Sequence, residues 1–402
     1  MVTVKEQYET YPYPERDPED ERRRLITGSP SHPVEMDHFL WQGQRDWSRT
    51  LRVLVAGGGT GDGLIQLATL MAQAKRPCEI TYLDLSTASR RIAEARAKVR
   101  GLDTIRFHTA SLLDAPEHGP FDYIDCCGVL HHLPEPEAGF AALRAALAPG
   151  GGMGFMVYAP YGRSGVYPLQ EAFAALFEGL PATERLARAR DIVSALPEGH
   201  PFRANLNLGD HRQSDAGFYD LLLHGQDRPY TVGELGEVMD RTGWALTGFA
   251  TPALYDLSLL AEVPAGMAPR EAMGLAEKLR GTIRMHTGYA VAQEAPVAPA
   301  SGRNRSAVPH LRGVGAPALA RAVSQEKPLP VTLGTVSTTI RLPRAAAPLI
   351  AAIDGRRSLT DLARGTGLDP LAFGTLWAQV ETALAPWGLL LFSGLLRRSP
   401  AS

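Results

Sequence analysis

Glycines alternate in one short segment of the chain, and a carboxylate follows about twenty residues later. Residues 52–63 read RVLVAGGGTGDG, with glycines at Gly57, Gly59 and Gly61, and residues 81–86 read TYLDLS, with Asp84. Glycine lets a backbone approach a ligand closely, and the start of a helix supplies unpaired N–H donors. A carboxylate that ends the next strand can accept hydrogen bonds from two ribose hydroxyls. The pattern predicts a pocket for a cofactor that contains adenosine.

The spacing of the glycines narrows the choice of cofactor. The dinucleotide fingerprint requires a third glycine or alanine at a position where this chain has Asp62 or Leu64, depending on the register. A phosphate-binding loop would continue into Gly-Lys-Ser/Thr, which does not follow here. The alternation Gly57-x-Gly59-x-Gly61 resembles the first motif of the class I S-adenosylmethionine-dependent methyltransferases.

Further motifs in the same order strengthen this resemblance. Residues 119–134 read GPFDYIDCCGVLHHLP, which is similar to the fourth motif of that family, in which a strand runs into Val-Leu-His-His-Leu. A turn at residues 149–152 (PGGG) and an apolar run at 153–158 follow. The resemblance covers about residues 50–160 and identifies the chain as a member of this family.

The fold expected for the chain is α/β, with a seven-stranded, mostly parallel sheet. Alternating patterns predict strands near residues 52–56, 80–84, 104–108, 122–127 and 153–158 with helices between them. Residues 245–255 and 285–292 are the candidates for the sixth and seventh strands. In the family fold, the seventh strand runs antiparallel between the fifth and the sixth.

The resemblance implies that S-adenosyl-L-methionine is the cofactor and that it lies against the glycine loop and the ends of the next strands. The cofactor-binding residues expected on this basis are Ala56, Gly57, Gly58, Gly59, Thr60, Gly61, Asp84, Leu85, Ser111, Leu112, Cys127, Gly128 and His132. Because Ser86 is well placed to cap the following helix, Asp84 is assigned to the ribose hydroxyls. The chain departs from the family at Val55, where an acidic residue is usual, and at Ser111, where Asp is usual.

Three residues are candidates for catalysis. His131 and His132 follow the fourth strand, at the sheet edge where α/β proteins bind ligands, and Tyr161 follows the fifth. Either imidazole could act as a general base. The interpretation that we favour is that the histidines pack the start of the next helix and touch the cofactor without taking part in chemistry.

Tyrosines and charged residues in three segments are candidates for binding the methyl acceptor. They lie in the N-terminal arm, in the loop after the fifth strand and in residues 219–230, and comprise Tyr11, Tyr13, Tyr158, Tyr161, Arg163, His224, Arg228 and Tyr230. Tyr8, Tyr11 and Tyr13 could close over the sulfonium through cation–π attraction, or simply anchor the arm.

The third of these segments also contains a possible set of metal ligands. Asp220 and His224 lie four residues apart and share a helix face, with His211 as a third candidate. A hydrogen-bonded helix terminus is the better explanation, and the vicinal Cys126 and Cys127 suit a buried strand rather than a shared ion. We therefore predict no metal.

Composition restricts the class of protein. The 402 residues carry a formal net charge of −2, which does not favour a nucleic-acid partner. Three cysteines suit a reducing compartment, and neither a signal peptide nor an apolar run of membrane-spanning length is apparent. A cytoplasmic enzyme without a membrane partner is expected, and the sequence does not indicate the oligomeric state.

The chain divides into four regions. Residues 1–50 form an N-terminal arm or lid, and residues 51–293 form the cofactor-binding domain, with a helical insertion at about 164–243. Residues 294–312, rich in Pro, Ala, Gly and Ser, are expected to be a linker. Residues 313–402 resemble a small, mostly helical winged-helix-like module.

Methyl transfer to an acceptor is the expected function, and the acceptor is left open between a small molecule and a protein. The long insertion can build a closed pocket for a small molecule, whereas the C-terminal module could hold a protein. The alternative is a non-catalytic sensor or adaptor that binds S-adenosylmethionine and engages a partner through the C-terminal module. Val55 and Ser111 favour that alternative.

Overall fold

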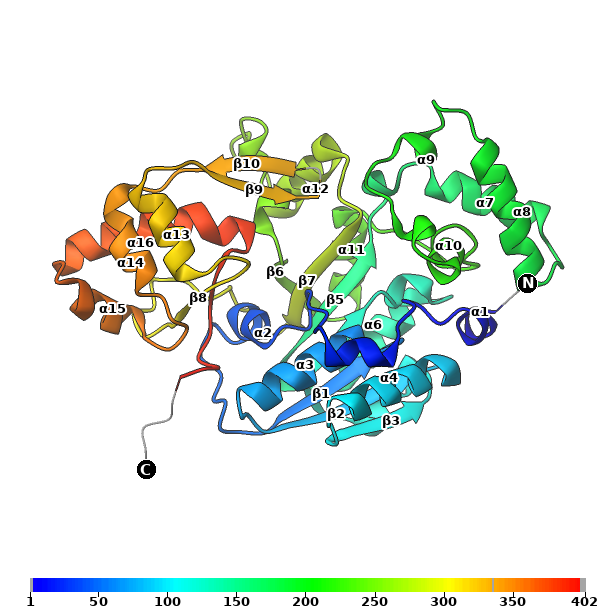
Figure 1. Cartoon of the computed structure of the whole chain (residues 1–402), viewed down its shortest axis with the longest axis horizontal. Coiled ribbons are helices and arrows are strands. Elements are labelled where there is room, and N and C mark those ends of the chain that lie inside the picture. Colours follow the sequence, from blue (N-terminus) through cyan, green and yellow to red (C-terminus); the bar gives the residue numbers. More distant parts are fainter. Residues whose placement is uncertain (1–2, 335, 398–402) are drawn as a thin grey trace.

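The computed structural model describes residues 3–334 and 336–397. Residues 1–2 and 398–402, at the outer ends of the first and last predicted regions, lie outside the described residues. Figure 1 shows a central sheet with the helical insertion at one side and the C-terminal module at the other. Among the described helices, none is long and apolar enough to cross a membrane.

Seven strands form the central sheet in the order β3-β2-β1-β4-β5-β7-β6. All pairs are parallel except those of β7, which runs antiparallel to both β5 and β6. The predicted fold class, including the position and direction of the seventh strand, is therefore confirmed. The strands are β1 (Leu51–Ala56), β2 (Cys78–Asp84), β3 (Ile105–Thr109), β4 (Phe121–Cys127), β5 (Leu147–Tyr158), β6 (Trp244–Phe249) and β7 (Met285–Ala292).

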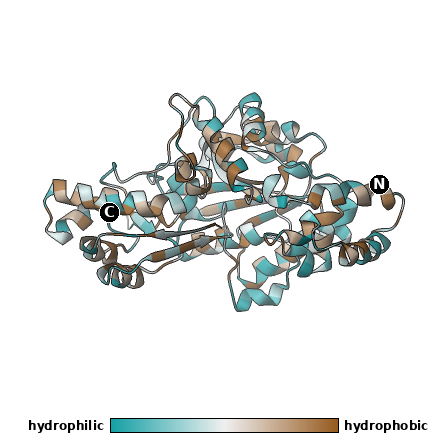
Figure 2. Cartoon of the chain, turned by 90° about the horizontal axis from the view of Figure 1, so that it is seen from above, coloured by the Kyte–Doolittle hydropathy of each residue, from teal (hydrophilic) through white to brown (hydrophobic). Residues whose placement is uncertain are grey.

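Helices cover both faces of this sheet, each through an apolar stripe. One face packs against α2 (Pro33–Leu40), α3 (Asp62–Gln73) and α4 (Thr87–Val99). The other packs against α6 (Pro136–Ala145) and α11 (Val232–Arg241), with α12 (Pro269–Arg280) beside α11. Most helices carry both hydrophobic and hydrophilic residues (Figure 2), as expected for helices with one buried face.

The helical insertion has a core of its own. It contains α7 (Val166–Leu176), α8 (Ala182–Ala195), α9 (Pro201–Ala204) and α10 (Asp215–Leu222), which share a separate apolar cluster. The insertion was predicted to extend to about residue 243. In the structure it ends before α11, because α11 belongs to the layer that covers the sheet. The short helix α1 (Val4–Thr10) of the N-terminal arm lies beside α4.

The C-terminal module consists of short helices and two small sheets. The helices are α13 (Ala316–Ser324), α14 (Ala347–Ala351), α15 (Leu359–Thr366) and α16 (Pro370–Leu384), and a hairpin forms from β9 (Leu329–Leu333) and β10 (Val336–Ile340). The terminal strand β11 (Leu390–Phe392) pairs with β8 (Pro309–Leu311). Because β8 lies within the predicted linker, that segment is part of the module rather than a free connector. The winged-helix-like assignment is not confirmed.

One buried carboxylate joins the C-terminal module to helix α2, which packs on the central sheet. Asp37 on α2 accepts hydrogen bonds from Trp47 Nε1 (2.9 Å), Ser393 Oγ (2.7 Å) and the backbone N–H of Gly394 (2.9 Å), and its other oxygen accepts one from the backbone of Arg45. Four donors therefore depend on a single side chain.

We expect Asp37→Ala to destabilise the protein by about 3 kcal/mol, because removing the carboxylate leaves several buried donors without partners. Urea unfolding of the full chain measures this loss. Asp46→Ala is the control, because Asp46 is exposed and its side chain bonds only Ser48 nearby. Equal stability of the two variants would show that Asp37 does not hold the module in place.

Candidate functional site

A cavity of about 720 Å³ opens at the carboxyl ends of the central strands. It is enclosed by the glycine loop after β1, the N-terminal arm, the loops after β2, β3 and β4, and part of the helical insertion. The chain crosses over between β1 and β4, where the strand order reverses, and open α/β sheets bind their ligands in the crevice at such a point.

The glycine loop has no room for side chains at its tightest positions. Gly57 has φ +67°, and a Cβ atom there would lie 2.5 Å from Cγ2 of Val129. A Cβ atom on Gly58 would lie 2.3 Å from the ring of Tyr82. Gly61, with φ +99°, is the N-cap of α3 and has no side chain to cap the helix. The loop can therefore run close to a bound ligand.

Asp84 ends β2 and holds the glycine loop. Its Oδ2 accepts the backbone N–H of Gly59 at 2.7 Å, and its Oδ1 accepts that of Ser86 at 2.8 Å. Burial raises the pKa of Asp84, and these two hydrogen bonds oppose the rise. Ser86 caps α4 by accepting the N–H of Ser89.

Most of the predicted cofactor-binding residues line the cavity. These are Ala56, Gly57, Gly58, Gly59, Asp84, Leu85, Ser111, Leu112, Cys127, Gly128 and His132. Thr60 and Gly61 do not: Thr60 is buried and its hydroxyl donates to the carbonyl of Pro14, while Gly61 starts α3. Ser111 accepts a hydrogen bond from the N–H of Leu113 and caps a short turn with Asp114.

His132 faces the cavity with a fixed tautomer. Its Nδ1 lies 2.8 Å from the carbonyl oxygen of Gln226, an atom that only accepts hydrogen bonds. Nδ1 must therefore carry the proton, which leaves the lone pair on Nε2. A neutral imidazole held in this way can accept a proton from a ligand in the cavity.

His224 lies behind His132 and has the opposite tautomer. The two rings stack with centroids 3.8 Å apart. Nδ1 of His224 accepts the N–H of Gln226 at 3.1 Å, so its proton is on Nε2, 3.3 Å from the hydroxyl of Tyr8. Burial and the neighbouring His132 lower the pKa of His224 well below its ordinary range.

Two tyrosines satisfy the carboxylate of Asp220. Tyr8 donates to Oδ1 at 2.9 Å, and Tyr158 donates to Oδ2 at 3.1 Å. Asp220 and His224 do come together as their spacing predicts, but His211 lies apart, with its ring against Phe202. Hydrogen bonds account for Asp220 and for the buried nitrogens of His224.

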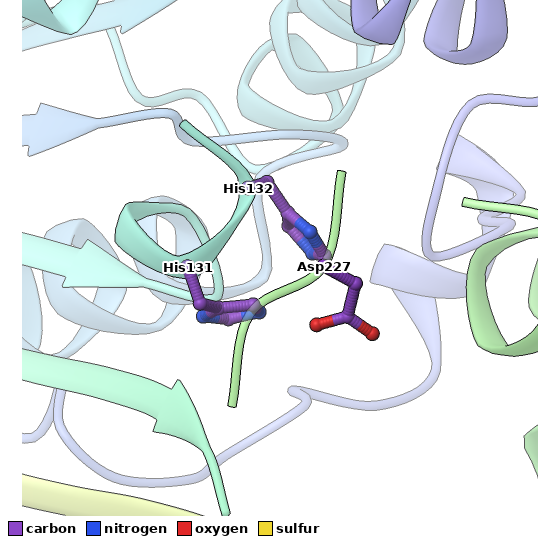
Figure 3. A group of neighbouring side chains, drawn as sticks. All are labelled: His131, His132 and Asp227. Carbon is purple, nitrogen blue, oxygen red and sulfur yellow. The ribbon is translucent and has the colours of Figure 1, made fainter. Parts of the chain in front are cut away.

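Figure 3 shows three side chains that point toward one another, those of His131, His132 and Asp227. One polar atom from each lies within 4.8 Å of the others. Asp227 Oδ2 accepts hydrogen bonds from Arg163 at 3.2 Å and from Gln170 at 3.0 Å, so a guanidinium already balances its charge. His131 is buried against the ring of Tyr158, and burial and His132 lower its pKa well below the ordinary range. His131 does not line the cavity.

The predicted acceptor residues divide into two groups. Tyr13, Tyr158 and Arg163 line the cavity, and the Arg163 guanidinium lies 3.6 Å from the centroid of the Tyr158 ring. The others lie outside the lining, and these are Tyr11, Tyr161, His224, Arg228 and Tyr230. Tyr11 stacks on Tyr219 of the insertion at 5.0 Å instead. Tyr161, the third catalytic candidate, is thus not positioned to reach a ligand in this cavity.

The N-terminal arm covers the cavity through a network of ion pairs. Arg16 pairs with Asp62 at 2.6 Å, and Arg96 on α4 joins Asp62 to Glu21, both at 2.7 Å. Arg96 is 1% exposed and Glu21 is 6% exposed, so the arm is fixed to the domain by buried charges. Tyr8 and Tyr13 of the arm line the cavity, as does Arg16.

Sequence reasoning missed several lining residues. Asp125, Gln226 and Arg284 come from a strand and two loops far apart in the chain. Asp125 alone carried a signal, because it is a carboxylate in the buried middle of a mostly apolar strand.

Comparison with known families decides what kind of domain forms this site. Residues 54–153 match the family described as "Methyltransferase domain", over the glycine loop, β2, β3 and β4. With the strand order above, this assigns residues 54–153 to a methyltransferase domain of the class I type. The chain contains a class I S-adenosylmethionine-dependent methyltransferase domain.

The methyltransferase domain has relatives of several kinds. An uncharacterized protein of Synechococcus sp. is 37% identical over 205 residues, which are 50% of this chain and 48% of that protein. The ubiquinone biosynthesis O-methyltransferase of Psychrobacter arcticus is 34% identical over 96 residues, 23% of this chain and 36% of that enzyme. The matches thus span about half of the first relative and a third of the second.

The fold of nearly the whole chain is similar to that of one solved protein. PKMT2 of Rickettsia typhi superposes with a TM-score of 0.62 over 92% of this chain and 76% of that chain, at 14% identity. The same protein in complex with AdoHcy gives a TM-score of 0.60. At this identity, the likeness establishes the fold alone.

Proposed function

We propose that this chain transfers the methyl group of S-adenosyl-L-methionine to an acceptor bound beside His132, and that the nucleophilic atom of the acceptor carries a proton. The observation that carries the proposal is that His132 lines the cavity while the Gln226 carbonyl holds its Nδ1, which leaves Nε2 as the basic nitrogen of the neutral ring. A hydroxyl or an ammonium acceptor must lose a proton, so a base in this position has a purpose.

The cavity fits the cofactor. Its tightest wall is the glycine loop, where a Cβ atom on Gly57 would meet Val129. Asp84 lines the cavity beyond that loop and is the residue that would meet the ribose hydroxyls. The same cavity includes Ser111 and Leu112, which follow β3 and would meet the adenine. When bound, the cofactor supplies an electrophilic methyl group on a sulfonium.

The chain's own residues would then align the acceptor and remove its proton. Nε2 of His132 takes the proton of the nucleophilic atom as that atom gains the methyl group. Tyr158 and Tyr13 close the acceptor side and exclude water, and the Arg163 guanidinium, 3.6 Å from the centroid of the Tyr158 ring, holds that ring in place. Holding the acceptor in this way accounts for much of the rate that such an enzyme needs.

Two measurements test the proposal. Isothermal calorimetry with S-adenosylmethionine and S-adenosylhomocysteine should show binding of both. Incubation of the protein with methyl-labelled cofactor and a cell extract should then label an acceptor, in the protein fraction or among the small metabolites. Binding without any transfer would favour the alternative of a sensor, and absence of binding would contradict the cofactor assignment.

A further inference from the structure

The sequence leaves one end of the cofactor without its usual partner. Val55, at the end of β1, stands where related methyltransferases usually have an acidic residue. Two neighbouring strand ends are accounted for, because Asp84 after β2 and Ser111 after β3 would meet the ribose and the adenine. The remaining, methionine end of the cofactor then belongs over β1 and β4, the central strands beside them.

A carboxylate lies directly beside Val55 on the next strand. Asp125 of β4 is paired with Val55 in the register of the sheet. Residues paired across parallel strands point to the same face, and Asp125 lines the cavity while being 2% exposed. A Cβ atom on Gly63, in the first turn of α3, would lie 2.8 Å from Asp125 Oδ2, so the carboxylate faces the start of that helix.

The other carboxylates of the cavity are already occupied or lie elsewhere. Asp62 is paired with two arginines, Asp84 accepts two backbone N–H groups and Asp220 accepts two tyrosine hydroxyls. Asp210 belongs to the insertion, on the acceptor side of the cavity.

Among the residues that the structure describes, Asp125 has a single hydrogen-bond partner and no cation. Its Oδ2 accepts a short hydrogen bond from Ser31 Oγ. Among residues 3–334 and 336–397, no side chain forms an ion pair with it and no donor reaches its Oδ1. Burial raises the pKa of Asp125 to about 6, with only the Ser31 hydrogen bond opposing the rise. Burying a carboxylate without a cation is costly, and a bound cation would offset that cost.

We propose that Asp125, held by Ser31, forms a subsite for a primary ammonium group and binds the α-ammonium of the cofactor in place of the acidic residue that β1 lacks. This inference rests on the proposed function, because it assumes that the cavity takes S-adenosylmethionine. In this chain, the carboxylate at this end of the cavity stands on β4, the strand next to β1. The cavity therefore has a carboxylate there although position 55 is a valine.

The test compares two ligands and three proteins by calorimetry. One ligand is S-adenosylhomocysteine, which lacks the sulfonium charge and so isolates the ammonium, and the other is its deamino analogue, with hydrogen in place of the α-amino group. The proteins are the unaltered chain, Asp125→Asn and, as a control on the same strand, Asp122→Asn. Asparagine keeps the volume and can still accept the Ser31 hydrogen bond, and Asp122 pairs with Arg52 at the opposite end of β4.

We expect Asp125→Asn to weaken binding of S-adenosylhomocysteine by about 10- to 100-fold, the range for a hydrogen bond between charged groups. Its affinity for the deamino analogue should be unchanged, and Asp122→Asn should bind both ligands as the unaltered chain does. The double variant Val55→Glu/Asp125→Val should bind S-adenosylhomocysteine more tightly than Asp125→Val alone, because it returns the carboxylate to β1.

The outcomes separate this inference from the proposed function. Suppose that the unaltered chain binds S-adenosylhomocysteine, but that Asp125→Asn weakens the binding of both ligands equally or of neither. The ammonium subsite is then wrong and the cofactor assignment stands. If the unaltered chain binds neither ligand, both fail. Thermal unfolding without ligand confirms that each variant is folded.

Discussion

His132→Asn is expected to reduce the rate of methyl transfer by about 10²- to 10⁴-fold, the contribution typical of a general base. The asparagine amide can still donate to the carbonyl of Gln226, as Nδ1 of the imidazole does at 2.8 Å. The variant therefore keeps this hydrogen bond and removes Nε2, the atom that carries the lone pair. Because the methyl donor itself is unaffected, binding of S-adenosylhomocysteine should change little.

The matched control is His224→Asn. Both imidazoles bind the backbone of Gln226, one through its carbonyl and the other through its N–H. Only His132 lines the cavity. Asparagine at position 224 can accept the Gln226 N–H, so we expect this variant to keep most of the activity. Single-turnover rates with the acceptor found by labelling, together with calorimetric affinities, give the comparison. A loss of equal size in both variants would mean that the histidine pair supports packing and that His132 is not the base.

The two histidines show where sequence reasoning stops. The Val-Leu-His-His-Leu motif places both residues after β4, and the interpretation favoured from sequence gave neither a chemical role. What separates them is the Gln226 carbonyl, 94 residues further along the chain. That atom fixes the tautomer of His132, whereas His131 packs on the ring of Tyr158 and does not line the cavity. The chemical difference between adjacent, identical residues depends on a contact made only in the folded chain.

The sheet was predictable for a different reason. Its parallel strands follow from alternating apolar runs and helical segments, which are local properties of the sequence. The place of the antiparallel β7 between β5 and β6 followed from the family resemblance. Neither a clear alternation of apolar runs nor the methyltransferase resemblance covers the C-terminal module. The pairing of β8 with β11 was therefore not predicted. Residues 294–312 have the composition of a linker, but Ala300, Ala307 and Val308 are buried in the structure.

The loss of the acidic residue at Val55 is the most instructive departure from the family. In the sequence motif alone, the absence of an acidic residue at position 55 weakens the cofactor site and favours a sensor. Read across the sheet, Val55 and Asp125 are neighbours, so the same end of the cavity still has a carboxylate. A sequence motif describes residues that follow one another along one strand, whereas a binding site depends on which residues lie close together in the folded sheet.

Gly57→Ala is expected to weaken binding of S-adenosylhomocysteine by about 100-fold. The added Cβ atom would lie 2.5 Å from Cγ2 of Val129, and the next nearest atom of that side chain is 2.8 Å away. Overpacking of this kind costs about 1–3 kcal/mol, and the backbone at φ +67° adds about 1–2 kcal/mol of strain for any residue other than glycine. The loop or the Val129 side chain must move to relieve the overlap, and both line the cavity. About 3 kcal/mol lost from binding corresponds to the 100-fold change.

Gly101→Ala separates the two causes. Gly101 also has φ +67°, but no atom lies within 4 Å of the position that its Cβ would take. It follows α4, well outside the residues that line the cavity. This variant should therefore lose about 1–2 kcal/mol of stability through backbone strain while its affinity for S-adenosylhomocysteine stays unchanged. Calorimetry and urea unfolding on both variants measure the two effects.

If Gly57→Ala lost stability to the same extent as Gly101→Ala and still bound the ligand normally, the close approach of the loop to Val129 would have no part in forming the cofactor site. A selective loss of binding would instead show that the absence of a side chain at Gly57 shapes the cavity.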